Sequence, residues 1–256
     1  TLRIDVDIRP VFIYGRYRKL DRGIPQTRWP CRACRGRAEG CEACEGTGLQ
    51  YPDSVQDLIG EPFRLVLSAE DTSFHGMGRE DIDVRCLGRG RPFVLEAKRP
   101  KVRRTDLEEV MEVVNSNASG KIEISDLRWT NRSEVSRIKE TRAEKSYTIR
   151  FSIEEPPEVP FIVESISNLS GVTLEQQTPK RVSHRRADRN RKRKVVSINN
   201  VVVEDNEVQF SVRCEAGTYV KELVHSDEGR TVPSVAGVLG SPCEVIWLDV
   251  EDIHAD

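Results

Sequence analysis

No apolar run in this sequence approaches the roughly 18 residues that a membrane-spanning helix needs, so we expect no membrane partner. The first residues show no charged segment followed by an apolar one, so we expect no secretory signal. The two signs of charge are balanced, with 40 Lys and Arg against 42 Asp and Glu, and the net charge of −2 gives no reason to expect a polyanion partner. What is present, 37% hydrophobic and 32% charged residues among 256, predicts one large or two modest globular domains with a buried core.

Seven cysteines are an odd number, and four of them lie in one short window, residues 31–44. The window holds two Cys-x2-Cys pairs, and each pair can place two thiolates on one tetrahedral ion. Because the window is rich in Gly, Arg and Glu and has almost nothing to bury, it cannot fold around a core of its own. We therefore predict a structural Zn²⁺ in an insertion over residues 31–48, with an iron–sulfur cluster or disulfides as alternatives. The four predicted ligands are Cys31, Cys34, Cys41 and Cys44.

The other three cysteines, Cys86, Cys214 and Cys243, are scattered along the chain, and two of them lie in apolar, strand-like runs. Such a distribution is typical of reduced, buried thiols. It predicts a cytoplasmic protein, where disulfides are disfavoured.

Strand-like and helix-like segments alternate without a strict βαβ rhythm, which predicts an α+β fold whose mixed or antiparallel sheet is flanked by helices. The clearest helix follows Thr105, because Thr105 and Glu108 form a capping box and apolar residues continue at helical spacing. Prolines at 156, 157 and 160 indicate a joint. We therefore expect one domain over residues 1–256 whose two lobes meet near 154–162.

Residues 82–97 alternate apolar and polar side chains on both sides of Gly-Arg-Gly, which predicts a hairpin. The hairpin would bring Asp83, Glu96 and Lys98 together, as in nucleases that gather two carboxylates and a lysine around Mg²⁺. Alternating charges on a solvated hairpin face would produce the same pattern by chance. A Mg²⁺-dependent nuclease is thus one alternative for this stretch.

The residues just before it, Gly78-Arg79-Glu80-Asp81, offer a different site. A glycine ahead of a polar turn lets the backbone pass close to a ligand. An aspartate beside an arginine is favoured in its charged form, as a nucleophile or a base must be. Four residues alone also fit an ordinary turn with a surface ion pair, so the surrounding sequence has to decide.

The stretch GREDIDVRCLGRGRPFVLEAKRP (residues 78–100) resembles the catalytic segment of pseudouridine synthases, and specifically of the Pus-ten family of archaea and eukaryotes. Four further blocks match in order: VFIYGRYRKLDRGIPQTRW (11–29), TPKRVSHRRA (178–187), AGTYVKELVHSDEGRTVPS (216–234) and LDVEDI (248–253). The resemblance implies a pseudouridine-synthase catalytic domain of the archaeal type with a central active-site cleft and no cofactor for catalysis. It also implies that the family's N-terminal RNA-binding domain is absent from this sequence.

By this resemblance, Asp81 is the catalytic aspartate, and Arg79 helps to swing the target nucleotide out of its stack. Tyr147, in KSYTIRF, matches the tyrosine that stacks on the target base. Lys221, in GTYVKEL, matches the basic residue that pairs with the aspartate. The remaining residues expected at the substrate are Arg181, His184, Arg185, Arg186, Tyr219 and, as the apolar residue packing under the site, Ile246 or Leu248.

Residues 180–194 hold nine Lys or Arg and a single acid, Asp188, and we call them the basic run. Arginine forks grip phosphate oxygens and release counterions, so the basic run predicts a phosphate-binding surface. The alternative is a solvated or disordered loop. Because no aromatic residues cluster there, we expect recognition of RNA shape and backbone rather than stacking on single strands.

These features together predict a tRNA pseudouridine synthase, an isomerase acting as a cytoplasmic monomer. The resemblance implies uridine 55, and in archaea also uridine 54, of the TΨC loop as substrates, with tRNA as the partner. Two alternatives are the nuclease named above and a non-catalytic, zinc-containing RNA-binding module.

Overall fold

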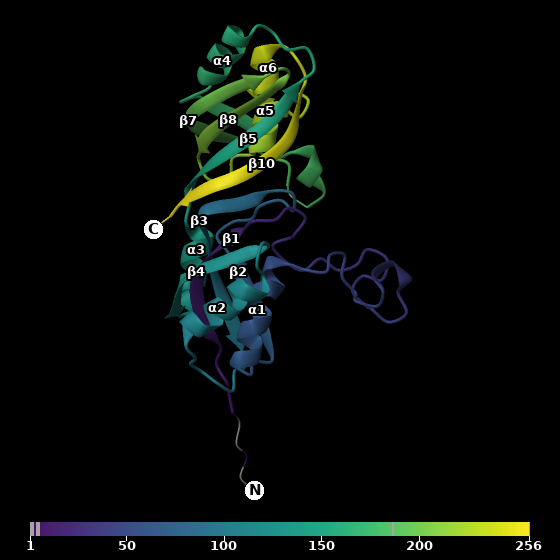
Figure 1. Cartoon of the computed structure of the whole chain (residues 1–256), viewed down its shortest axis with the longest axis vertical. Helices are drawn as coiled ribbons and strands as arrows, with labels where there is room; N and C mark the ends of the chain where they lie inside the picture. Colours follow the sequence, from purple (N-terminus) through teal and green to yellow (C-terminus); the bar gives the residue numbers. More distant parts are fainter. Residues whose placement is uncertain (1–2, 4–5, 186, 256) are drawn as a thin grey trace. The chain divides into compact units, whose positions relative to one another are not determined.

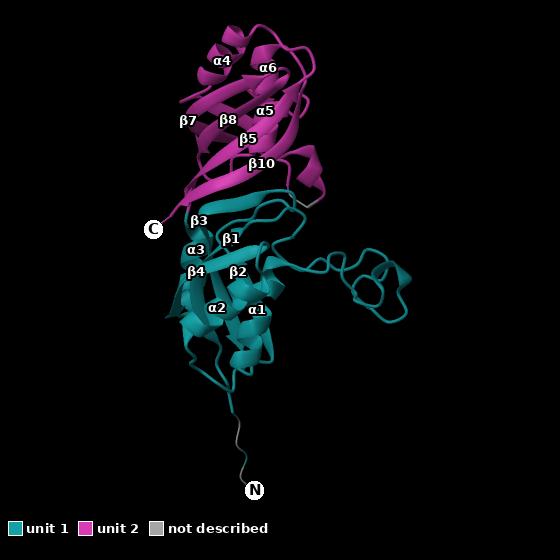
Figure 2. Ribbon diagram, in the orientation of Figure 1, with its two compact units in different colours: residues 1–141 teal, residues 142–256 magenta. Residues whose placement is uncertain are grey.

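The structure, a computed structural model, describes residues 3, 6–185 and 187–255. The chain divides into two compact units, residues 1–141 and 142–256 (Figure 2). The joint predicted near 154–162 is therefore misplaced. The division comes earlier because β5 (Glu144–Ile153) pairs along its length with strands of unit 2, whereas the prolines follow β5 and lead into α4 (Val159–Ser167).

Unit 1 is built on an antiparallel sheet in the order β4–β1–β3–β2 (Figure 1). Its strands are β1 (Val11–Lys19), β2 (Asp71–Gly76), β3 (Arg85–Lys98) and β4 (Ile122–Thr130). Its helices are the short 3-10 helix η1 (Glu42–Cys44), α1 (Val55–Val66), α2 (Leu107–Asn117) and α3 (Arg132–Glu140).

The core of unit 1 forms where α1 and α2 pack on the sheet, and Phe63, Leu95 and Val114 are fully buried in one hydrophobic cluster. Side-chain caps start both helices. Ser54 caps α1, because its side chain accepts a hydrogen bond from the backbone amide of Asp57. The cap of α2 is Asp106 rather than Thr105, because the Asp106 carboxylate accepts hydrogen bonds from two backbone amides of the first turn.

The hairpin predicted over residues 82–97 is wrong, because β3 continues through Gly-Arg-Gly without reversing. Tyr17 of β1 opposes Arg91, but Lys19 opposes Cys86, so residues 87–90 form a bulge in β3. Both glycines have a positive φ, 54° and 77°. A Cβ on the second would lie 2.8 Å from the Tyr17 carbonyl oxygen, so close approach of the two strands requires a glycine there.

The strands of unit 2 are antiparallel and follow the order β10–β5–β8–β7–β6–β9. Its other strands are β6 (Thr173–Gln177), β7 (Asn190–Glu204), β8 (Glu207–Cys214), β9 (Thr231–Val232) and β10 (Cys243–His254). Its remaining helices are the 3-10 helix η2 (Lys180–Arg185), α5 (Val220–His225) and α6 (Val235–Leu239). Alternation along β5 buries Ile149, Phe151 and Ile153 completely, as the sequence pattern predicts.

The α+β prediction is confirmed, and every strand pair described within the two units is antiparallel. The central cleft stays a prediction.

No described helix combines the length and the apolar character needed to cross a membrane. Cys86, Cys214 and Cys243 are buried free thiols, and burial raises the pKa of Cys86 to about 12, which makes its reactive thiolate scarce.

Candidate functional site

The loop between β2 and β3 carries Gly78-Arg79-Glu80-Asp81, and we call residues 78–82 the aspartate loop. Gly78 opens it with a φ of 75°, a conformation that favours glycine. The three side chains that follow differ in their exposure: Arg79 is exposed, Glu80 is buried and Asp81 is half-buried. The loop therefore has one buried anchor, Glu80, between the exposed Arg79 and the half-buried Asp81.

The anchor is an ion pair in the interior of unit 1. The Glu80 carboxylate and the Arg91 guanidinium are 0% and 1% exposed, and Oε2 lies 2.7 Å from Nε. Arg91 also donates a hydrogen bond from Nη1 to the Met77 carbonyl (2.8 Å). Two buried charges are tolerated only when they are paired and hydrogen-bonded, so this geometry holds Met77 and Glu80 against β3.

Further hydrogen bonds complete the anchor. The buried Tyr17 hydroxyl donates to Glu80 Oε1 (2.8 Å) and accepts from Gln26 Nε2 (2.8 Å), which also donates to the Gly78 carbonyl (3.1 Å). Burial, and then the negative charge of Glu80, raise the pKa of Tyr17 well above its usual value. Tyr17 therefore stays a hydroxyl donor to Glu80 across the physiological range.

The main chain of Asp81 is held by a buried lysine. Lys19 Nζ donates to the carbonyls of Ile24 (2.8 Å), Asp81 (3.1 Å) and Ile82 (3.1 Å), and Gly23 N donates to the Ile82 carbonyl (2.9 Å). Burial lowers the pKa of Lys19, and the nearby Glu80 carboxylate opposes that shift. A half-buried carboxylate on a main chain fixed in this way is suited to act as a nucleophile or a base, because little freedom is lost on reaction.

The residues expected to work with Asp81 belong to unit 2. Tyr147 in β5 opposes Val250 of β10, while Leu248 opposes Ile149, so Tyr147 and Leu248 lie diagonally on one face of the sheet. Leu248 is 7% exposed. Ile246 instead lies at the β10 bulge and is 48% exposed, so Leu248 is the better candidate for the apolar residue under a site. The meeting of Asp81 with these residues stays a prediction.

Lys221 and Tyr219 lie at the beginning of α5, which packs on β10. The fully buried Gln176 of β6 holds this beginning in place: its Oε1 accepts from Tyr219 N (3.0 Å) and its Nε2 donates to the Tyr219 carbonyl (2.9 Å). Both main-chain groups of Tyr219 are thus fixed ahead of Lys221.

Most of the described residues of the basic run lie in regular secondary structure. Its first part is η2, and residues 190–194 begin β7, where they pair with β6. Lys192 and Lys194 are exposed, whereas Arg191 and Arg193 oppose the buried Gln176 and Leu174 and share their face. The run therefore presents two chemically different faces.

Among the predicted substrate residues of η2, Arg181 forms a fork with the buried Glu222 of α5, at 2.6 Å (Nε–Oε1) and 3.3 Å (Nη2–Oε2). This ion pair joins η2 to α5. His184 is exposed. Arg185 ends η2, and Arg186 lies outside the described residues.

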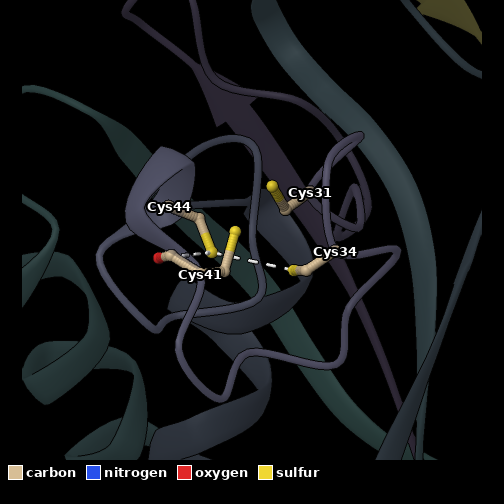
Figure 3. A group of neighbouring side chains, drawn as sticks. All are labelled: Cys31, Cys34, Cys41 and Cys44. Carbon is tan, nitrogen blue, oxygen red and sulfur yellow. Dashed lines mark hydrogen bonds between the residues drawn. The ribbon is translucent and has the colours of Figure 1, made fainter.

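The four predicted cysteine ligands come together (Figure 3). Their sulfur atoms all lie within 4.8 Å of one another, and Cys34 Sγ is 3.8 Å from Cys44 Sγ. Four thiolates about 2.3 Å from one zinc have sulfur–sulfur separations of about 3.8 Å, so the residues fit a tetrahedral metal site. Backbone N–H groups, first that of Ala38, lower the pKa of the Cys34 thiol to about 6, which favours the thiolate that a metal binds.

The nuclease alternative fails on geometry. Asp83 precedes β3 and Glu96 lies near its far end, so at roughly 3.3 Å per residue they are on the order of 30 Å apart. Glu96 instead contacts His75 (3.1 Å), and Lys98 pairs with Asp71 (2.9 Å). Within the described residues, the cysteine cluster is the only set of three or more His, Cys, Asp or Glu whose ligand atoms gather closely.

Sequence reasoning missed the residues that hold the aspartate loop: Tyr17, Lys19, Gln26, Glu80 and Arg91. The sequence contained one signal that could have indicated these residues. Strand alternation places Lys19 on the same face as Ile13, which is in the core, and a charged residue at a core-facing position is rare unless it has buried partners.

Comparison with known proteins shows one family over nearly the whole chain. Residues 12–254 match the family model described as Pus10, C-terminal. A protein of Methanothrix thermoacetophila named tRNA pseudouridine synthase Pus10 is 48% identical over 98% of this chain and 55% of its own length. A protein of the same name from Methanocaldococcus jannaschii is 46% identical over 99% of this chain and 55% of its own. The chain spans about half the length of these curated relatives.

Among solved structures, a chain of a Cbf5–Nop10–Gar1 complex is similar to 78% of this chain and covers 45% of its own length. The two are 19% identical, and the TM-score is 0.47.

Proposed function

We propose, because the chain belongs to the Pus10 C-terminal family, that it is the catalytic part of a tRNA pseudouridine synthase, which isomerises uridine 55 and also uridine 54 of the TΨC loop. The observation that carries the proposal is the aspartate loop. It presents Asp81, the aspartate of the GRED segment, half-buried on a main chain fixed by Lys19, and it turns Glu80 inward as an anchor.

The isomerisation breaks the bond from uracil N1 to C1′ of the ribose and forms a bond from C5 to C1′, and it is balanced by the loss of the proton on C5 and the gain of a proton on N1. In the proposed reaction the Asp81 carboxylate attacks C1′ or removes a sugar proton. The Tyr147 ring holds the detached base while it turns, and Leu248 packs beneath it. Lys221 pairs with the carboxylate, and Arg79 helps to swing the nucleotide out of its stack. No step requires a metal or another cofactor.

The proposed partner is tRNA, which the protein binds as a cytoplasmic monomer. Reduced, buried thiols suit a reducing compartment. Lys192 and Lys194, which are exposed on β7, support contact with RNA phosphates, since they lie on an ordered element.

The direct test uses unmodified tRNA transcript in monovalent salt without added divalent cations. Pseudouridine is located by carbodiimide treatment and primer extension. We expect stops that report modification at positions 55 and 54, with the RNA length unchanged. Binding without any modified uridine would instead support a non-catalytic RNA-binding module and would contradict the proposal.

For the basic run, we expect Arg189→Ser, Lys192→Ser and Lys194→Ser together to weaken tRNA binding and to flatten its salt dependence. Each neutralised phosphate adds roughly 0.7 to 0.9 to the slope of log K against log salt, so three lost contacts flatten it by about 2 to 3. Filter binding at several salt concentrations measures both effects. A control with equal charge loss is Lys101→Ser, Arg132→Ser and Lys139→Ser, three exposed residues of unit 1. If the two triple variants have the same tRNA affinity and the same salt slope, the basic run makes no specific phosphate contacts.

We further propose that the cysteine cluster holds one structural Zn²⁺. Thiolate coordination supplies folding free energy to a segment without a core, so removal of the metal should disorder residues 31–44 before any other part of unit 1. Metal analysis should find one zinc per chain, and amide hydrogen exchange should localise the loss of order. A brown protein that absorbs visible light would identify an iron–sulfur cluster instead.

A further inference from the structure

The segment that leads into the cysteine insertion lies along the aspartate loop. Gln26 Nε2 donates to the Gly78 carbonyl (3.1 Å), and three residues later the Trp29 ring lies under the Arg79 guanidinium, 5.7 Å from Cζ to the ring centre. A cation this close to an indole face is attracted to it. The Arg79 side chain is exposed. Among the described residues, the Trp29 ring is the group that contacts its guanidinium.

Trp29 also forms the base of the insertion, which extends away from the sheet of unit 1 between β1 and α1 (Figure 1). Gln50 N donates to the Trp29 carbonyl (2.9 Å), and Cys31 N donates to the Gly48 carbonyl (2.8 Å). The Tyr51 ring packs edge-on against Trp29, with centres 5.5 Å apart and planes at 77°. The first cysteine ligand is therefore only two residues from the ring that supports Arg79.

We propose that the metal-bound insertion sets the position of Arg79 through Trp29, so that metal at the four cysteines controls the loop that carries Asp81. Trp29 is then a positioning residue. The insertion has no core of its own. Without metal, the two chain segments that begin at Trp29 and end at Gln50 are no longer held together at the four cysteines, and the Trp29 ring loses its fixed orientation. The effect on turnover depends on the proposed synthase function, whereas the effect on loop order does not.

Substitutions at Trp29 test the contact. A partly exposed cation–π contact corresponds to about a two- to five-fold effect, so Trp29→Leu should lower kcat/KM for tRNA by that factor. Trp29→Phe keeps an aromatic face and should stay within about twofold of the unaltered protein. The matched control is Trp129→Leu, which removes a ring that lies 4.5 Å from the Arg104 guanidinium on a different part of unit 1 and should leave kcat/KM within about twofold.

Amide hydrogen exchange tests the coupling without an activity assay. The protein is stripped of metal with a chelator, dialysed, and compared with the same sample after zinc is added back. Metal removal should increase exchange in residues 78–84 of the unaltered protein and leave residues 107–117 of α2 unchanged. In Trp29→Leu, exchange in residues 78–84 should already be raised, and metal removal should add little, because both changes break the same link.

Two results would overturn the coupling. The first is metal removal that opens residues 31–44 but leaves exchange in residues 78–84 unaltered. The second is an activity loss on metal removal that is as large in Trp29→Leu as in the unaltered protein, which is the result for independent effects. If the zinc-loaded protein forms no pseudouridine, the proposed function fails, and the exchange experiment still decides whether metal and loop are coupled.

Discussion

Asp81→Asn is expected to lower pseudouridine formation by about 1,000-fold or more while leaving the fold and tRNA affinity intact. The carboxylate is proposed to react directly, and the amide, of nearly equal size, has neither the charge nor the basicity for that step. The main chain at Asp81 is held through its carbonyl by Lys19, which the substitution does not touch. Single-turnover kinetics, filter binding and thermal unfolding measure the three quantities.

Asp83→Asn is the matched control, two residues further along the same segment. Asp83 is exposed in a turn, and Arg22 Nη1 donates to its main-chain carbonyl (2.7 Å), a contact that does not involve the altered atoms. We expect Asp83→Asn to keep substantial activity. An inactive Asp83→Asn beside a normal Asp81→Asn would reverse the assignment of the catalytic aspartate.

Arg91→Met is expected to destabilise the protein by about 3 to 5 kcal/mol, because it leaves the Glu80 carboxylate buried without its counter-charge. Activity should fall as well, since the aspartate loop loses its anchor. Urea unfolding measures the loss of stability, and kcat measured below the unfolding transition separates a mispositioned loop from an unfolded protein.

Two comparisons sharpen this prediction. Lys98→Met on the same strand removes an exposed ion pair with Asp71, and we expect a cost below about 1 kcal/mol. Adding Glu80→Gln to Arg91→Met removes the isolated charge and should recover part of the lost stability. A cost for Arg91→Met as small as that for Lys98→Met would show that the buried pair does not hold the loop.

The sequence by itself determined the features whose physics is local. The gathering of the four cysteines was predictable because two Cys-x2-Cys pairs in a segment without a core indicate metal binding as the way to order it. The start of α1 at Ser54 and the buried face of β5 follow from capping and from strand alternation, which involve only neighbouring residues. Asp81 was singled out by its segment, which needs no knowledge of distant contacts.

Only the tertiary structure decided what depends on distant partners. The glycines at 88 and 90 signal a turn in isolation, yet they form a bulge, because the pairing of β3 with β1 continues on both sides of them. Glu80 looks like a surface acid in the sequence, and only the approach of Arg91 and Tyr17 makes its burial favourable. The two faces of the basic run follow from pairing with β6, and the link from Trp29 to Arg79 joins residues fifty positions apart. Interactions between segments far apart in sequence leave no periodic signal in either one, so the anchor of the aspartate loop became visible only in the folded chain.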